Sequence, residues 1–240
     1  MEQEESLIRL DLFEKAESEG LRVFPDNPIG AALVKKSFLE EPMTEEEENT
    51  LMDLIQKKQY DPEVLELFKR SREHDPLSAL VEVNNGTTLH VSPEETNKKI
   101  WTYGLGRCNA TLTFIETKGG VREIILTHFF PDKIKDQASK ITKLFSAVDT
   151  KNIQKAKTVI FALGRKNGDE LEIENAKNTD ILTAMILSQT PQTTIECIPY
   201  PPFQNRLSGT KNQGVLIADI PGSLRGDATY QTWFTNGKLS

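Results

Sequence analysis

One short stretch holds the residues best suited to chemistry. It reads "TYGLGRC" from Thr102 to Cys108, and it places one of the two cysteines of the chain within four residues of two glycines. A thiolate is a strong nucleophile, and glycines leave the backbone bare, so that N–H groups can hold a developing oxyanion. Cys108 is therefore a candidate nucleophile, with the backbone at Gly104 and Gly106 as the candidate oxyanion site.

A cysteine nucleophile needs a base, and the segment that follows supplies one. Residues 108–128, "CNATLTFIETKGGVREIILTH", predict two antiparallel strands joined by a three-residue loop, with Gly120 in the left-handed conformation. In this register Cys108 lies opposite Phe130, and His128 is its diagonal neighbour on the same face, roughly 7–8 Å away. A two-residue loop would instead place the two side chains on opposite faces.

This arrangement leaves two interpretations of Cys108 open. In the first, His128 is the general base and the Thr102 hydroxyl orients its imidazole or the substrate. In the second, Cys108 is a core residue, because it shares its face with Ala110 and Leu112, and a free cysteine often behaves as a small buried hydrophobe.

The residues that carry the first interpretation resemble a known family. The pattern T-x-G-L-G-x-C at Thr102–Cys108, followed by "KGGVREIILTHFFP", is similar to the signature of the CheD chemoreceptor glutamine deamidases. That family shares a fold and a Cys–His–Thr site with deamidating toxins of the cytotoxic necrotizing factor type. The likeness covers roughly residues 85–220. Arg107 departs from it, because the family usually has a small residue beside the cysteine.

The resemblance implies a protein-glutamine deamidase. Cys108 would be the nucleophile, His128 the base and Thr102 the supporting polar residue, acting through a thioester on a protein substrate that bears a reactive glutamine. A bacterial effector that modifies a host protein would suit this layout. Two alternatives stay open: a transglutaminase with the same Cys–His chemistry, and a catalytically inactive protein-binding module.

Charge divides the chain into two parts. Residues 1–75 hold 20 acidic and 10 basic residues, whereas residues 76–240 hold 16 and 19. We therefore predict an acidic helical region over 1–75, which could dock a basic partner surface, and a catalytic α/β domain over 76–240.

Composition narrows the class of protein further. The lack of a concentrated basic face argues against nucleic-acid binding, and no apolar run approaches the roughly 20 residues that span a bilayer. The acidic start of the sequence is unlike a signal peptide, so we expect a cytoplasmic protein or one exported without a classical signal. The sequence predicts no cofactor and no metal site.

Periodicity predicts the elements around the candidate site. Helix starts are indicated at Asn27, at Thr44 with Glu47 in capping-box spacing, and at Asp61. From about residue 85, short β-branched segments predict strands, interrupted by helical stretches over 131–148 and 178–189. The predicted fold class is a layered α/β sandwich with a mixed or antiparallel sheet.

Other polar residues are weaker candidates. We expect Cys197 to be a buried structural thiol, and His74 and His90 to lie at the surface or to serve the structure. The segment 199–209, "PYPPFQNRLSG", could rim a pocket. Three carboxylates flank the hairpin, and the sequence does not select which of them could orient His128: Glu116, Glu123 and Asp132.

Overall fold

The computed structural model describes residues 2–92, 95, 97–120, 122–148, 152–167, 170–200, 214–219, 229–235 and 237–239. Within it the chain forms two compact units, Met1–Leu65 and Glu66–Ser240. The first unit contains α1 (Glu2–Val23), α2 (Pro28–Phe38) and α3 (Glu45–Gln59), and α4 (Pro62–Arg72) runs across the boundary. The described residues contain no helix of the length and hydropathy that a membrane span requires.

The helix starts lie where the sequence predicted them. The Asn27 side chain accepts a hydrogen bond from the N–H of Gly30 at 3.0 Å. Thr44 and Glu47 form a complete capping box, in which each side chain accepts the other's backbone N–H. Short polar side chains satisfy N–H groups that a helix start leaves without partners, which is why these residues fix the boundaries.

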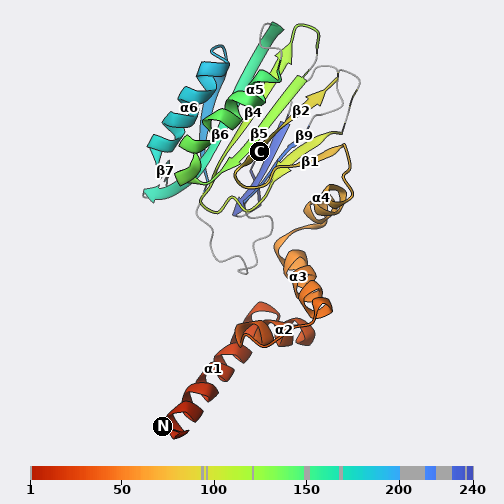
Figure 1. Cartoon of the computed structure of the whole chain (residues 1–240), viewed down its shortest axis with the longest axis vertical. Helices are drawn as coiled ribbons and strands as arrows, with labels where there is room; N and C mark the ends of the chain where they lie inside the picture. The colour runs from red at the N-terminus through yellow and green to blue at the C-terminus, as the bar shows by residue number, and fades with distance from the viewer. Residues whose placement is uncertain are drawn as a thin grey trace. The chain divides into compact units, whose positions relative to one another are not determined.

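The second unit is built on two β-sheets (Figure 1). The smaller has the order β1-β3-β9-β10-β11, and the larger has the order β2-β5-β4-β6-β7 with β8 beside β6. Pairing is parallel between β1 and β3 and between β6 and β8, and antiparallel elsewhere, so the sheets are mixed as predicted. The strands are β1 (Ser78–Leu80), β2 (Asn85–Val91), β3 (Lys99–Thr102), β4 (Asn109–Thr117), β5 (Arg122–Phe129), β6 (Ile153–Asn167), β7 (Glu170–Ile173), β8 (Thr194–Tyr200), β9 (Val215–Asp219), β10 (Thr229–Thr235) and β11 (Gly237–Leu239).

Two apolar cores make this unit a three-layer α/β sandwich. One core joins the two sheets, with Ile100 and Leu216 of the smaller sheet packed among residues of the larger such as Leu112 and Leu126. The other core lies under α5 (Ala138–Ser146) and α6 (Ala176–Gln189), which cover the opposite face of the larger sheet (Figure 1). Side chains alternate between the faces of a strand, so the central strands β4, β5 and β6 contribute to both cores.

Some elements differ from the sequence prediction. The stretch 131–148 begins with two single 3-10 turns, η1 (Pro131–Lys133) and η2 (Lys135–Gln137), and regular α-helix covers only α5. Pro131 fits a first helical position, but the turn after it follows directly from the end of β5 and bonds in the tighter pattern, with the N–H of Lys133 donating to the carbonyl of Phe130. The short strands β1, β7 and β11 were not predicted, because three or four residues carry too little periodicity.

Candidate functional site

The β4–β5 hairpin has the predicted register. Asn109 pairs with Phe129 and Ala110 with His128, which continues to Cys108 opposite Phe130. Gly120 closes the loop with a φ of +77°, a conformation that glycine adopts without steric cost. Because side chains alternate along a strand, His128 shares the face of Leu126 and lies toward the smaller sheet, as does Cys108. The hairpin prediction is confirmed.

A hydrogen bond joins His128 to the other sheet. The hydroxyl of Thr102, at the end of β3, lies 2.8 Å from Nδ1 of His128 and 2.6 Å from the carbonyl oxygen of Val81. A hydroxyl has one proton, and a carbonyl can only accept, so Thr102 donates to Val81 and accepts from the Nδ1–H of His128. This bonding pattern fixes the neutral tautomer whose lone pair is on Nε2.

Burial keeps His128 neutral. Its side chain is 1% exposed, and burial lowers the pKa of its imidazole to about 4. Nε2 has no hydrogen-bond partner among the described residues. The neutral imidazole keeps an unpaired lone pair on Nε2 that can accept a proton, which is the protonation state in which a general base begins a reaction.

Cys108 and His128 line the same cavity, here called the Cys108 pocket. It encloses about 1000 Å³. Three loops, the end of β5 and one residue of β6 form its walls. The lining residues are Glu82, Val83, Tyr103, Gly104, Gly106, Arg107, Cys108, His128, Phe130, Leu163 and Glu174. The tertiary structure therefore brings Thr102, Cys108, His128 and both predicted glycines to one place.

The loop before Cys108 carries the chain from one sheet to the other. Gly104 has a φ of +73°, and the N–H of Gly106 donates to the carbonyl of Gly104 at 2.7 Å. Leu105 is fully buried and ties the loop down through a bond from its N–H to the carbonyl of Gly214 at 3.1 Å. The Gly104 N–H forms no hydrogen bond among the described residues and is the better candidate oxyanion donor of the two, since the Gly106 N–H must first leave its partner.

The Cys108 thiol is protonated in this resting arrangement. The residue is 3% exposed, and burial raises the pKa of the thiol to about 11, with the negative charge of Asp132 adding to the rise. The backbone N–H of Arg107, directed at the sulfur, opposes this effect. The unbound site therefore holds a thiol and a neutral imidazole rather than an ion pair.

This protonation state predicts how Cys108 reacts with iodoacetamide. In a Cys197→Ser background, the alkylation rate should rise roughly tenfold per pH unit from about pH 7 to about pH 10, because the thiolate fraction grows in that proportion below the pKa. Mass spectrometry of the tryptic Cys108 peptide measures the rate, and Cys108→Ser supplies the background. A rate that levels off near neutral pH would contradict the raised pKa.

Two supporting groups escaped the sequence analysis. Tyr200, fully buried at the end of β8, donates its hydroxyl proton to the carbonyl of Cys108. The carbonyl of Val81, at the end of β1, anchors the Thr102 hydroxyl. No local motif marks either group, because both act through contacts between strands that are distant in sequence.

The remaining candidates fall outside the site or change role. Cys197 was expected to be buried, and this prediction was wrong: it is exposed on β8, whose one partner among the described strands is β6. Of the flanking carboxylates, Glu123 bonds His90 at 2.6 Å rather than His128. The side chain that bonds His128 is Thr102. Most of the predicted rim segment, residues 201–209, lies outside the described residues.

The described part of the chain contains no group of three or more His, Cys, Asp or Glu side chains arranged to hold a metal ion. The arrangement described above is therefore built from a thiol, an imidazole, a hydroxyl and backbone groups.

Comparison with known proteins finds a distant likeness in structure. No family model matches the chain, and no curated protein does. Among solved structures, it is similar to the C-terminal domain of CNFy from Yersinia pseudotuberculosis, with a TM-score of 0.29 and 9% sequence identity. The match covers 63% of this chain and 55% of that one, so the chain spans little more than half of the neighbour's length. A likeness at this level carries no argument about function.

Proposed function

We propose that the chain is a cysteine-dependent amidohydrolase that converts glutamine side chains of a polypeptide to glutamate. The observation that carries the proposal is the Thr102–His128 hydrogen bond. Because Nδ1 holds the proton in this bond, Nε2 keeps an unpaired lone pair that can accept a proton, and His128 lines the same pocket as Cys108. The likeness of Thr102–Cys108 and His128 to the CheD signature gives the same residues the same roles.

The reaction begins with the thiol. Cys108 turns toward His128, Nε2 takes the thiol proton, and sulfur attacks the carboxamide carbon of the substrate. The carbonyl π electrons move to oxygen, and the Gly104 N–H donates a hydrogen bond to the oxyanion. When the tetrahedral intermediate collapses, the C–N bond breaks and His128 gives its proton to nitrogen, so that ammonia leaves and a thioester remains.

Water completes the cycle. His128, neutral again, takes a proton from a water molecule as its oxygen attacks the thioester carbonyl. The C–S bond then breaks, the sulfur regains its proton from His128, and the product is a glutamate side chain. Thr102 stays bonded to Nδ1–H throughout and keeps Nε2 directed at the reacting atoms.

The surface around the pocket suits a polypeptide substrate. Among the described residues of the second unit, five large apolar side chains are exposed, and three of them line the Cys108 pocket: Val83, Tyr103 and Phe130. Exposed apolar side chains that cluster at the opening of one pocket are typical of surfaces that bind proteins. A free amino acid would leave most of this surface uncovered.

The test is an assay on glutamine-containing polypeptides. Incubation of the full chain with casein or glutamine peptides should release ammonia and increase the substrate mass by the difference between an amide and an acid. Addition of a primary amine separates the two acyl-transfer outcomes, since a transglutaminase would form the amine adduct instead. Absence of both products across a broad panel of folded and unfolded protein substrates would refute the proposal.

A further inference from the structure

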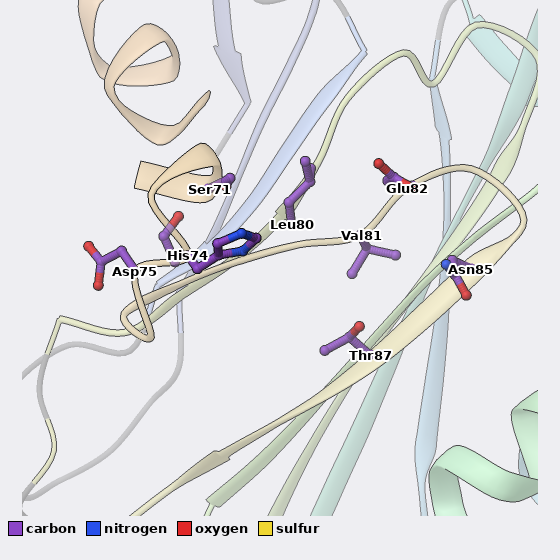
Figure 2. Close-up of a pocket in the computed structure, with 9 residues that line it drawn as sticks. Ser71, His74, Asp75, Leu80, Val81, Glu82, Asn85 and Thr87 are labelled. Carbon is purple, nitrogen blue, oxygen red and sulfur yellow. The ribbon is translucent and has the colours of Figure 1, made fainter. Parts of the chain in front are cut away.

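A second hollow lies beside the Cys108 pocket. It encloses about 410 Å³ and is here called the Ser78 hollow. Figure 2 shows Ser71, His74 and Asp75, from the end of α4 and the turn after it, on one side, and Asn85 and Thr87 of β2 on the other. Between them runs the segment Leu80–Glu82, which begins at the last residue of β1 and crosses the view.

Polar side chains line most of the Ser78 hollow, and two of them, Asp75 and Glu82, are carboxylates. The Ser78 side chain is 5% exposed, and neither its hydroxyl nor that of Ser71 has a partner among the described residues. Glu82 forms no ion pair in the described chain, and Asp75 binds Arg70 and the N–H of Leu77. None of the described residues that line the hollow is a lysine or arginine. Unpaired buried hydroxyls beside an unneutralised carboxylate favour a ligand that carries positive charge and several donors.

One backbone segment separates this hollow from the Cys108 pocket. Val81 lines the Ser78 hollow, Val83 lines the Cys108 pocket, and the exposed Glu82 lines both. The segment is held firmly, because the N–H of Val81 donates to the carbonyl of Trp101 at 2.8 Å and its carbonyl accepts from Thr102. The two cavities are thus neighbours whose linings share Glu82, and in an extended peptide the side chains of alternate residues, roughly 6.5–7 Å apart, lie on one face.

We propose that the Ser78 hollow is a subsite for a lysine or arginine side chain of the polypeptide substrate, two residues from the glutamine. This inference rests on the proposed function. An extended substrate lying across the segment Val81–Val83 places alternate side chains in the two cavities. The cationic head then pairs with Glu82 and donates to the hydroxyls of Ser71 and Ser78, while the glutamine carboxamide reaches Cys108.

Peptide binding tests the subsite without reliance on catalysis. Acetylated, amidated pentapeptides with a central glutamine carry lysine, norleucine or glutamate two residues before or after it, with alanine elsewhere. Their affinity for the full-length Cys108→Ala variant is measured by NMR titration. A lysine peptide in one of the two orientations should bind at least about tenfold more tightly than its norleucine counterpart, which keeps the aliphatic stem but lacks the ammonium group.

Three variants locate the effect. Glu82→Lys should remove the preference for lysine. Asp180→Lys makes the same change of charge at an exposed position of α6 and should leave the preference intact. Ser78→Ala should weaken binding of the lysine peptide several-fold without lowering the thermal stability, because its hydroxyl has no partner to lose. A serine that only supported the fold would show the opposite pattern.

The outcomes separate this inference from the proposed function. Equal affinity for lysine and norleucine peptides, no measurable binding of either, or an unchanged preference in Glu82→Lys overturns the subsite, whatever the enzyme activity. Lysine-dependent binding to Cys108→Ala together with a wild-type chain that deamidates none of the peptides supports the subsite and counts against the proposed function.

Discussion

Replacement of Cys108 by alanine is expected to lower the rate of glutamine deamidation by at least about 10³-fold, because it removes the nucleophile and no thioester can form. The fold should survive. Cys108 packs in the core between the sheets, and loss of one buried atom costs about 0.5–1.5 kcal/mol of unfolding free energy. Ammonia release and substrate mass give the activity, and chemical denaturation gives the stability.

The second cysteine supplies the matched control for this prediction. Cys197→Ala removes an exposed thiol outside the pocket and should leave the deamidation rate unchanged. If Cys108→Ala kept full activity, Cys108 would be a core residue only, and the protein-binding module would be the better interpretation. A partner that binds wild type and Cys108→Ala equally well, with no change to the partner, would support that module.

Thr102→Val is expected to damage both stability and catalysis. Valine has nearly the shape of threonine but no hydroxyl, so the carbonyl of Val81 and the Nδ1–H of His128 each lose a buried partner. Each unsatisfied group costs about 1–3 kcal/mol. The imidazole loses the contact that fixes its tautomer and orientation, and we expect the deamidation rate to fall about 10²-fold.

Thr102→Ser distinguishes the contribution of the hydroxyl from that of the buried methyl group. Serine keeps the hydroxyl and deletes one methyl group at a fully buried position, which costs about 1 kcal/mol, and should retain activity within a few-fold. NMR of the His128 ring nitrogens gives a readout that packing alone does not move: the Nδ1–H tautomer should dominate in wild type and Thr102→Ser but not in Thr102→Val. Equal losses of activity in both variants would show that the hydroxyl has no catalytic part.

The sequence predicted the elements well where the interactions that fix them join residues close in the chain. Asn27 and Thr44 cap their helices because a short polar side chain can reach only the N–H groups of the next turn. Gly120 set the hairpin register, and with it the face that Cys108 and His128 share, because the side-chain period of a strand is two. These features involve residues that are close in sequence or connected by one tight turn.

The protonation states depended on the three-dimensional environment. Nothing in the sequence around Cys108 or His128 indicates a thiol pKa near 11 or an imidazole pKa near 4. Both follow from burial between two sheets, and the second sheet is assembled from segments on either side of the hairpin in the sequence. For the same reason the sequence misplaced Cys197, whose exposure depends on what covers a sheet edge.

The sequence by itself determined which three side chains are the candidates for catalysis, the hairpin that aligns two of them and the glycine bend before Cys108. Only the tertiary structure decided that Thr102 bonds His128, that Val81 and Tyr200 hold the site, and that a second polar hollow lies one backbone segment away. The physical reason is that these contacts join β1, β3, β5 and β8 across two sheets. Sequence periodicity specifies which face of a strand is buried but not which strand lies against it.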